Sequence, residues 1–178
     1  GPVISGAYDE IQALAEALEI PVATSVSGQG IIADSHPLAV GLVGSNGGVV
    51  ETRAIVEQAD LVFFIGCRAG SVTSERWRFP KPGAVKVVHL DVDGATIGAN
   101  YPTDVAIVGD AKLSLAALVE EVRDRVSKAP QRQLGRDAVA RAKAEKFAQF
   151  DALAASDDRP IKPERVVKTL NELMPSDG

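Results

Sequence analysis

The chain has 178 residues, of which 46% are apolar and only 4% aromatic, and its formal net charge is −5. This composition predicts one domain with an appendage and an aliphatic core, and the acidic balance excludes a nucleic-acid surface. No apolar run approaches the roughly 20 residues that span a bilayer. The single cysteine, Cys67, allows no internal disulfide and fits a reducing cytosol. The chain starts at Gly1 without methionine or signal peptide and stops at Gly178, so we expect a piece of a longer polypeptide.

The first third of the chain alternates helix, strand and glycine-rich turn. Apolar residues at helical spacing predict a helix from Tyr8 to Leu18, and Pro21 to Val26 is a candidate short strand. The glycine cluster Gly44–Gly48 precedes a second helix, from about Val49 to Ala59. A helix N-terminus behind glycines offers backbone N–H groups to an anion, although a tight turn that only needs positive φ explains the cluster equally well.

Two strands form the centre of the predicted fold. Leu61–Ile65 is wholly apolar, which indicates a strand covered on both faces, as in a parallel sheet. Gly66-Cys67-Arg68 follows it, and the second strand, Val85–Leu90, is followed by Asp91 and Asp93. Open α/β sheets place ligands at the carboxyl ends of their strands. We therefore expect a crevice here, built for a nucleotide or for a neighbouring domain.

The next elements complete an α/β pattern. Ser71–Pro82 is mostly polar and predicts a surface loop, and Asp93–Ile97 starts a short helix. Val105–Val108 is a last strand, after which Asp110 caps a helix that runs to about Val126. Strand–helix alternation of this kind predicts a parallel sheet with helices on both faces.

The composition changes after Ser127. Lys128–Gly135 is a polar linker, and Arg136–Leu153 is a charged helix with a thin apolar line. After a second linker, Asp157–Pro160, a helix from Pro163 to Met174 carries a strong apolar stripe. Such a stripe requires a partner.

Several candidate sites have a structural interpretation that is simpler. Gly28-Gln29-Gly30 matches the start of the dinucleotide fingerprint, but Asp34–Pro37 follows where that motif needs a helix, so an ordinary loop is favoured. Arg68 either holds a phosphate or flat ring, or is a plain surface arginine. Asp91 and Asp93 either accept hydrogen bonds from ribose hydroxyls or cap the turn before Gly94.

The remaining reactive side chains indicate no catalysis. Cys67 lacks a partner histidine for a nucleophile, and His36 and His89 have no metal-binding spacing and are expected to be structural. Ser27, Ser71 and Ser74 lack the strand–turn–helix context of a nucleophilic serine. The residues alone thus predict a nucleotide-binding type of α/β domain without catalytic machinery.

Five motifs follow one another in a recognisable order: Ile20–Ser25 with Gly28-Gln29-Gly30, Gly41–Gly47, Ala59–Val62 with Ile65–Arg68, Val87–Asp93, and Val108–Ala111. From about Gly1 to Val126 the chain resembles the central domain of thiamine-diphosphate-dependent enzymes, nearest the group of acetolactate synthase, glyoxylate carboligase, oxalyl-CoA decarboxylase and benzaldehyde lyase. The tail from Pro160 to Gly178 is similar to the segment that leads into their third domain.

The resemblance implies a Rossmann-like sheet of about six strands, the first of them truncated at Gly1, which would expose sheet edges. Residues 1–127 would form the central domain, and residues 128–178 a helical linker toward the pyrophosphate-binding domain. The parent would be a cytoplasmic lyase or transferase, a decarboxylase or carboligase of 2-oxo acids or acyl-CoA, and a homodimer or homotetramer. Its other two domains would bind thiamine diphosphate and Mg²⁺. Here Gly109-Asp110 is followed by Ala111 rather than glycine, so this part should be non-catalytic.

In flavin-containing relatives the central domain holds FAD in a structural role, and in others it holds ADP or CoA. The matching motifs would place cofactor contacts at seven residues: Gly44, Gly47, Gly66, Arg68, Asp91, Asp93 and Asp110. Two departures, Asn46 in place of a histidine and Ala69-Gly70-Ser71 in place of an acidic pair, fit an ADP-binding or flavin-free member equally well. Alternatives are a free-standing NAD- or FAD-binding oxidoreductase domain, and an interaction module whose docking arm is Arg136–Met174.

Overall fold

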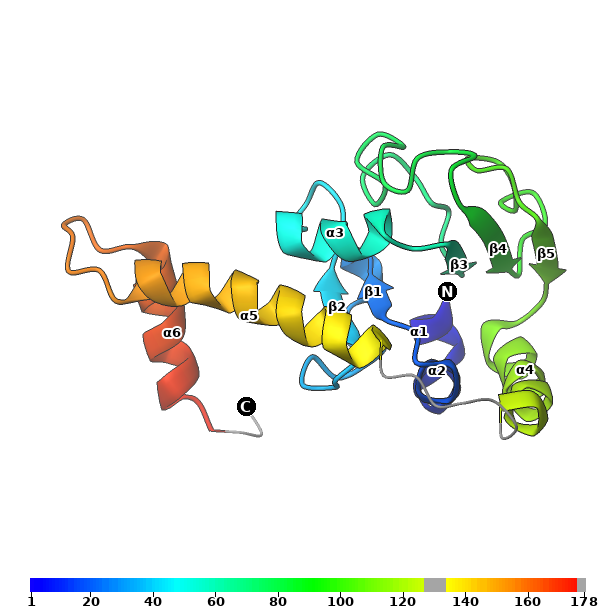
Figure 1. The fold of residues 1–178 in the computed structure, drawn as a ribbon, viewed down its shortest axis with the longest axis horizontal. Coiled ribbons are helices and arrows are strands. Elements are labelled where there is room, and N and C mark those ends of the chain that lie inside the picture. Colours follow the sequence, from blue (N-terminus) through cyan, green and yellow to red (C-terminus); the bar gives the residue numbers. More distant parts are fainter. Residues whose placement is uncertain (127–133, 176–178) are drawn as a thin grey trace.

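The computed structural model describes residues 1–126 and 134–175, which form an α/β body and a helical arm (Figure 1). The strands are β1 (Val22–Thr24), β2 (Ala39–Leu42), β3 (Leu61–Ile65), β4 (Lys86–Asp91) and β5 (Val105–Val108). The helices are α1 (Pro2–Ser5), α2 (Tyr8–Leu18), α3 (Val50–Glu57), α4 (Ala111–Val126), α5 (Leu134–Ala154) and α6 (Pro163–Leu173), with a 3₁₀ turn at Val26–Gly28. The predicted α/β class is therefore confirmed.

All strand pairs are parallel, but the strands form two sheets instead of the single sheet of about six strands that we expected. β1 pairs with β2, and β3, β4 and β5 pair in that order. Within the described part of the chain, β1 and β3 each have a neighbour on one edge only. β3 has one open edge, but its side chains meet packed residues on both faces: Phe63 and Ile65 pack with Leu90 on one face, and Phe64 packs with Val87 and Tyr101 on the other. The cover is partial, since Leu61 is 43% exposed and the rest of the strand is half-buried.

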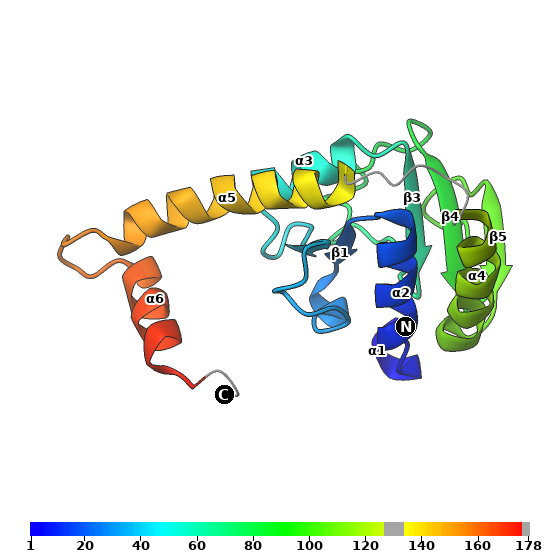
Figure 2. The same cartoon turned by 60° about the horizontal axis from the view of Figure 1, so that its bottom comes forward.

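The main core lies between the β3–β4–β5 sheet and two helices. Helices α2 and α4 pack side by side along one face of this sheet (Figure 2). Ile11 and Leu14 of α2 and Leu115 and Val119 of α4 are buried with Leu90 of β4, so the apolar side of each helix faces inward. Burying side chains of this size stabilises the fold by about 1.5–3 kcal/mol each.

The other face of β4 is covered by loops rather than by a helix. Val87 and Tyr101 are almost fully buried there with Ala69, and Phe64 packs against them. The Tyr101 hydroxyl donates a hydrogen bond to the Pro80 carbonyl oxygen over 2.9 Å. Burial raises the pKa of Tyr101 above its ordinary value. The loop after β3 is thus anchored to the body at both ends.

Two local predictions were wrong, and one strand was missed. The segment Asp93–Ile97 is a turn and not a helix: the Asp93 carboxylate accepts the Ala95 N–H and the Thr96 hydroxyl, and the chain leaves helical geometry at Gly98, which has a φ of +75°. β2 was not anticipated. The linker predicted to reach Gly135 ends earlier, since α5 already begins at Leu134; the linker residues 128–133 lie outside the described residues.

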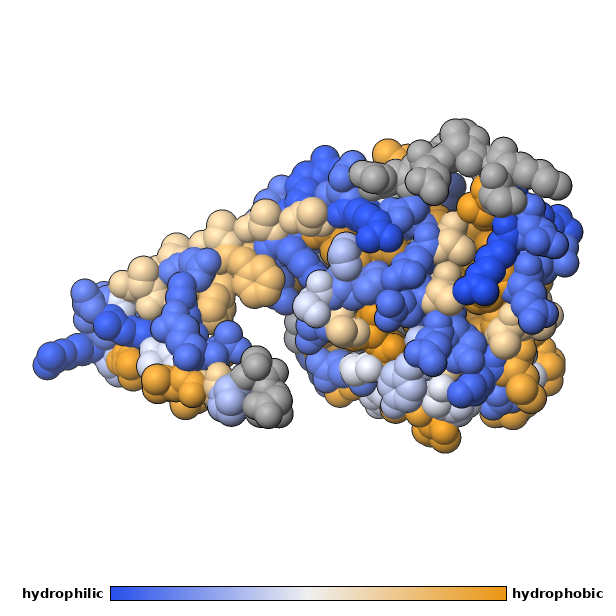
Figure 3. All heavy atoms as spheres, turned by 90° about the horizontal axis from the view of Figure 1, so that it is seen from below, coloured by the Kyte–Doolittle hydropathy of each residue, from blue (hydrophilic) through white to orange (hydrophobic). Residues whose placement is uncertain are grey.

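The arm consists of α5, which packs on α3 and β2, and α6, which folds back at the far end of α5. α6 turns a polar side toward α5, where Lys168 Nζ lies 2.6 Å from Asp151 Oδ1. Its apolar stripe is exposed and forms part of the apolar surface seen on the arm (Figure 3): Val166, Val167, Leu170, Leu173 and Met174. Among the described residues, no helix has the length and apolar character needed to cross a membrane.

Candidate functional site

The carboxyl ends of β3, β4 and β5 lie next to one another and carry three of the seven predicted site residues. The Gly66 N–H, just after β3, donates to the Leu90 carbonyl oxygen of β4 over 2.7 Å. The Gly109 N–H, just after β5, donates to the Asp91 carbonyl oxygen over 3.0 Å. These bonds extend the parallel ladder past the strand ends. They hold three predicted site residues at the carboxyl end of the sheet: Gly66, Asp91 and Asp110, which follows Gly109.

Arg68 and Asp93 line a small pocket beside the carboxyl end of the sheet. The pocket has a volume of about 140 Å³ and is also lined by Ala95, Thr96, Ala99 and Asn100. Asn100 Nδ2 donates to the Arg68 carbonyl oxygen over 2.8 Å, which ties the turn after β3 to the turn after β4. A guanidinium, a carboxylate, a hydroxyl and an amide therefore converge on a space that is smaller than the 300–1,000 Å³ of usual ligand pockets.

The three aspartates already cap backbone groups. Asp93 accepts hydrogen bonds from the Ala95 N–H and the Thr96 hydroxyl, over 3.0 and 3.2 Å. One Asp91 oxygen accepts the Asp93 N–H over 3.0 Å, and one Asp110 oxygen accepts a backbone N–H at the start of α4 over 3.0 Å. The capping interpretation thus holds for all three. The second oxygens of Asp91 and Asp110 make no hydrogen bond within the described part of the chain.

Gly44 and Gly47 do not line this pocket. Gly44 is buried with a φ of +99°, and a Cβ atom there would lie 2.4 Å from the Val72 carbonyl oxygen. The next residue, Ser45, donates its N–H to the same oxygen over 2.9 Å. Gly47 has a φ of +123°, and its Cβ would lie 2.5 Å from Leu42 Cδ2. Both glycines have positive φ, which is the structural reason weighed for this cluster, and both also lie in close packing that the sequence did not predict.

The start of α3 is capped by a threonine inside the helix. Thr52, 3% exposed, accepts the Val49 N–H at its hydroxyl oxygen over 3.2 Å, and the hydroxyl lies 3.2 Å from the Leu42 carbonyl oxygen. This side chain joins the end of β2 to α3 and fixes the Gly44–Gly48 turn between them.

The sequence analysis missed a buried ion pair below the Ser71–Pro82 loop. Arg53 of α3 donates two hydrogen bonds to the Glu75 carboxylate, over 2.9 Å from Nε and 2.7 Å from Nη2. Glu75 is only 7% exposed, and the Arg53 guanidinium also stacks 4.8 Å from the Phe79 ring centre. A separation of 22 residues gives no sequence signal for such a pair. The loop itself is irregular, as predicted.

Cys67 and the two histidines make contacts within the fold. His89 is 2% exposed, and its Nε2 lies 3.0 Å from the Cys67 carbonyl oxygen. His36 Nδ1 accepts the Leu38 N–H over 3.1 Å, so its Nε2 carries the proton donated to Glu16 over 3.0 Å. In the described ranges, no group of three or more His, Cys, Asp or Glu side chains is arranged to hold a metal ion.

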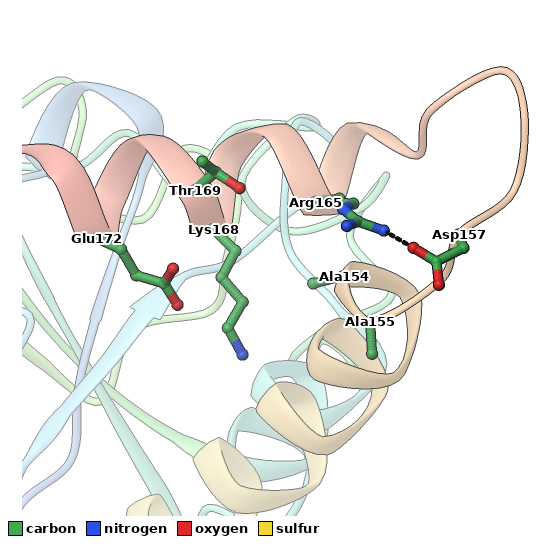
Figure 4. Close-up of a pocket in the computed structure, with 7 residues that line it drawn as sticks. All are labelled: Ala154, Ala155, Asp157, Arg165, Lys168, Thr169 and Glu172. Carbon is green, nitrogen blue, oxygen red and sulfur yellow. Dashed lines mark hydrogen bonds and ion pairs between the residues drawn. The ribbon is translucent and has the colours of Figure 1, made fainter.

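A larger hollow, of about 370 Å³, lies between α5 and α6 (Figure 4). Its charged walls are Arg165, Lys168, Asp157 and Glu172. Arg165 pairs with Asp157, and the hydrogen bond and charge of Asp151 raise the pKa of Lys168. Because both cations already have carboxylate partners, this hollow is a junction between the two helices and not an anion site.

Comparison with known proteins identifies a family that matches most of this chain. The family described as "Thiamine pyrophosphate enzyme, central domain" matches residues 1–118. A probable acetolactate synthase large subunit of Methanocaldococcus jannaschii is 36% identical over 98% of this chain and 28% of its own length. One from Methanococcus aeolicus is 34% identical over 96% of the chain, also 28% of its length. The acetolactate synthase isozyme 3 large subunit of Escherichia coli is 28% identical over 100% of the chain and 30% of its length.

Proposed function

Because this chain belongs to the family of thiamine pyrophosphate enzyme central domains, we propose that it is the non-catalytic central domain of an acetolactate synthase-like enzyme. The observation that carries this proposal is alignment along the whole chain, α5 and α6 included, with large subunits named acetolactate synthase. The chain spans about 28% of the length of the first of these relatives. The remaining sequence of a parent enzyme of that length is ample for two further domains.

In this proposal residues 1–127 are the central domain, and residues 128–178 lead toward the pyrophosphate-binding domain. Thiamine diphosphate and Mg²⁺ are held by the other two domains of a cytoplasmic, oligomeric parent. The parent is a carboligase that forms acetolactate from a 2-oxo acid. The central domain spaces and orients the two catalytic domains. The docking of α5 on α3 and β2 supports this role, because it fixes the direction in which the arm leaves the body.

The carboxyl ends of β3, β4 and β5 form the proposed nucleotide site. Arg68 would contact a phosphate group, while Thr96, Asn100 and the free oxygen of Asp91 offer partners for ribose hydroxyls. The pocket volume of about 140 Å³ suits one part of a nucleotide and not a whole flavin dinucleotide. We therefore favour an ADP-like ligand that lies mostly outside the pocket, with FAD as a test case. Gly44 and Gly47 would shape the neighbouring loop, and Gly66 and Asp110 the sheet edge.

The nucleotide site is tested by thermal unfolding of the purified chain with ADP, FAD, CoA and NAD in turn. A ligand at about 100 times its dissociation constant adds about 2.7 kcal/mol to the free energy of unfolding. The expected result is a higher melting temperature with ADP that is lost in Arg68→Ala. The matched control is Arg123→Ala, which removes an exposed arginine from the last turn of α4 and should leave the shift intact. No shift with any ligand would refute nucleotide binding.

The domain role is tested separately on the full-length parent. With thiamine diphosphate and Mg²⁺, the parent should form acetolactate from a 2-oxo acid, and the chain of residues 1–178 alone should not. A parent that is inactive with 2-oxo acids but active with acyl-CoA would change the substrate and keep the domain assignment. Activity of the isolated chain would refute the non-catalytic role.

A further inference from the structure

The Ser71–Pro82 loop contains one turn of left-handed backbone. Glu75, Arg76 and Trp77 have φ angles of 49°, 61° and 57°, and none of them is glycine. Side chains with a Cβ atom rarely adopt this region, and consecutive residues almost never do. Such a run persists only where its surroundings fix it, and strained backbone of this kind is concentrated at functional surfaces.

The surroundings that fix this turn are buried. Ser74 is 2% exposed, and its hydroxyl oxygen accepts the Trp77 N–H over 3.0 Å. The Glu75 carboxylate is clamped by the two hydrogen bonds from Arg53. Both anchors point inward from the turn, so the backbone has no freedom to relax while they are in place.

The consequence is that three large side chains are held in solvent. Trp77 is 40% exposed, the Arg78 side chain is 68% exposed, and Arg76, which directly follows the two anchors, is exposed as well. Trp77 is the only tryptophan of the chain. Tryptophan and arginine are the residue types that most often dominate the binding energy of protein–protein interfaces. A tryptophan flanked in the sequence by two exposed arginines, presented on a rigid turn, has the composition of an interface anchor.

The turn is unsuited to a phosphate group. A phosphate cradle needs free backbone N–H groups. Here the N–H groups of Arg76, Arg78 and Phe79 donate to the Ser71 and Ser74 carbonyl oxygens, over 2.6, 2.9 and 3.1 Å. The Trp77 N–H is bound to the Ser74 hydroxyl. The Arg76 and Arg78 side chains instead suit carboxylates around an apolar spot, because both are exposed even though Arg78 Nε already donates to the Glu75 carbonyl oxygen over 3.0 Å.

We propose that Trp77, with Arg76 and Arg78, is the anchor through which this domain docks on an acidic, partly apolar surface of a neighbouring domain of its parent enzyme. The inference rests on the proposed function, because a chain that spans 28–30% of its relatives leaves most of the parent surface in other domains. A second copy of the same loop is a poor partner, since it would bring like charges together.

The test is hydroxyl-radical footprinting of the full-length parent, read by mass spectrometry at Trp77. The expected result is oxidation about tenfold slower than that of free N-acetyltryptophanamide, and a several-fold faster rate in the double variant Arg76→Glu/Arg78→Glu. The control variant Arg123→Glu should keep the slow rate. Acetolactate formation is assayed on the same samples, so that failure of docking and failure of the proposed reaction are distinguished.

Three outcomes would overturn the docking proposal. The first is a Trp77 oxidation rate in the parent close to that of the free compound. The second is an unchanged slow rate in the charge-reversed variant. The third is protection that appears only when inorganic phosphate or ADP is added, which would make the surface a ligand site. A variant Trp77→Phe, which keeps an aromatic anchor, should retain most of the activity, whereas Trp77→Ala should lose several-fold more.

Discussion

The replacement of Gly44 by alanine tests whether the glycine cluster serves close packing. At φ +99° an added Cβ strains the backbone, which costs about 1–2 kcal/mol. The same atom would lie 2.4 Å from the Val72 carbonyl oxygen, so the loop must move and the Ser45–Val72 hydrogen bond is lost, at about 1 kcal/mol. The sum, about 2–3 kcal/mol, corresponds to a melting temperature about 4–12 °C lower for a chain of this size.

Two other glycines separate the causes of this loss. Gly30 has a φ of +83° with open space around it, so Gly30→Ala should cost the backbone strain alone. Gly70 has open space and an ordinary φ, so Gly70→Ala should change the free energy of unfolding by less than about 0.5 kcal/mol. Thermal and urea unfolding followed by circular dichroism measure all three. If Gly44→Ala costs no more than Gly30→Ala, the close contact with Val72 is wrong.

The remaining predictions concern buried polar and backbone contacts. Arg53→Met leaves the Glu75 carboxylate buried without its main partner and should lower the free energy of unfolding in urea by about 3 kcal/mol. The double variant Arg53→Met/Glu75→Gln should recover part of this loss, and losses that simply add would contradict the pairing. Gly135→Ala places a Cβ 2.0 Å from a carbonyl oxygen at the end of α2 and should speed hydrogen exchange at the start of α5. The pKa of Glu16 is lowered, chiefly by the hydrogen bond from His36, so this pair stabilises the fold above the ordinary carboxyl pKa and loses its effect as the pH falls through the lowered value. A carboxyl NMR titration should therefore show a higher Glu16 pKa in His36→Ala, and an unchanged value would refute the contact.

Helices could be predicted where apolar residues at helical spacing form a single stripe. Tyr8–Leu18 was predicted with its bounds, and the helix after Asp110 to within a residue, because the burial of each follows from apolar spacing alone. β2 was missed because Ala39-Val40-Gly41-Leu42 is short and contains a glycine at φ +92°, so its strand character depends on pairing with β1. The exposed edge of β3 likewise depends on which strands are its neighbours.

The candidate site was predictable in place but not in detail. The rule that ligands lie at strand ends selected Arg68 and Asp93, and the structure brings both to one pocket. Thr96 and Asn100 were missed because they belong to a turn that the sequence suggested was helical. The left-handed turn at Trp77 has no local signal, since its conformation is fixed by Arg53 more than twenty residues away.

The docking of α5 at Gly135 has a mechanical consequence. With 21 residues, α5 is about 30 Å long, and it carries α6 at its far end. The helix is held at its start, where Gly135 leaves no room for a Cβ beside the Glu19 carbonyl oxygen, and again near its far end, where Gln149 donates a hydrogen bond to Glu51 of α3 over 2.8 Å. If the contacts with α3 gave way, a tilt of about 10° at Gly135 would move the tip by about 5 Å, close to the pitch of one helical turn. The position of α6 is therefore set by α3 as well as by the backbone at Gly135.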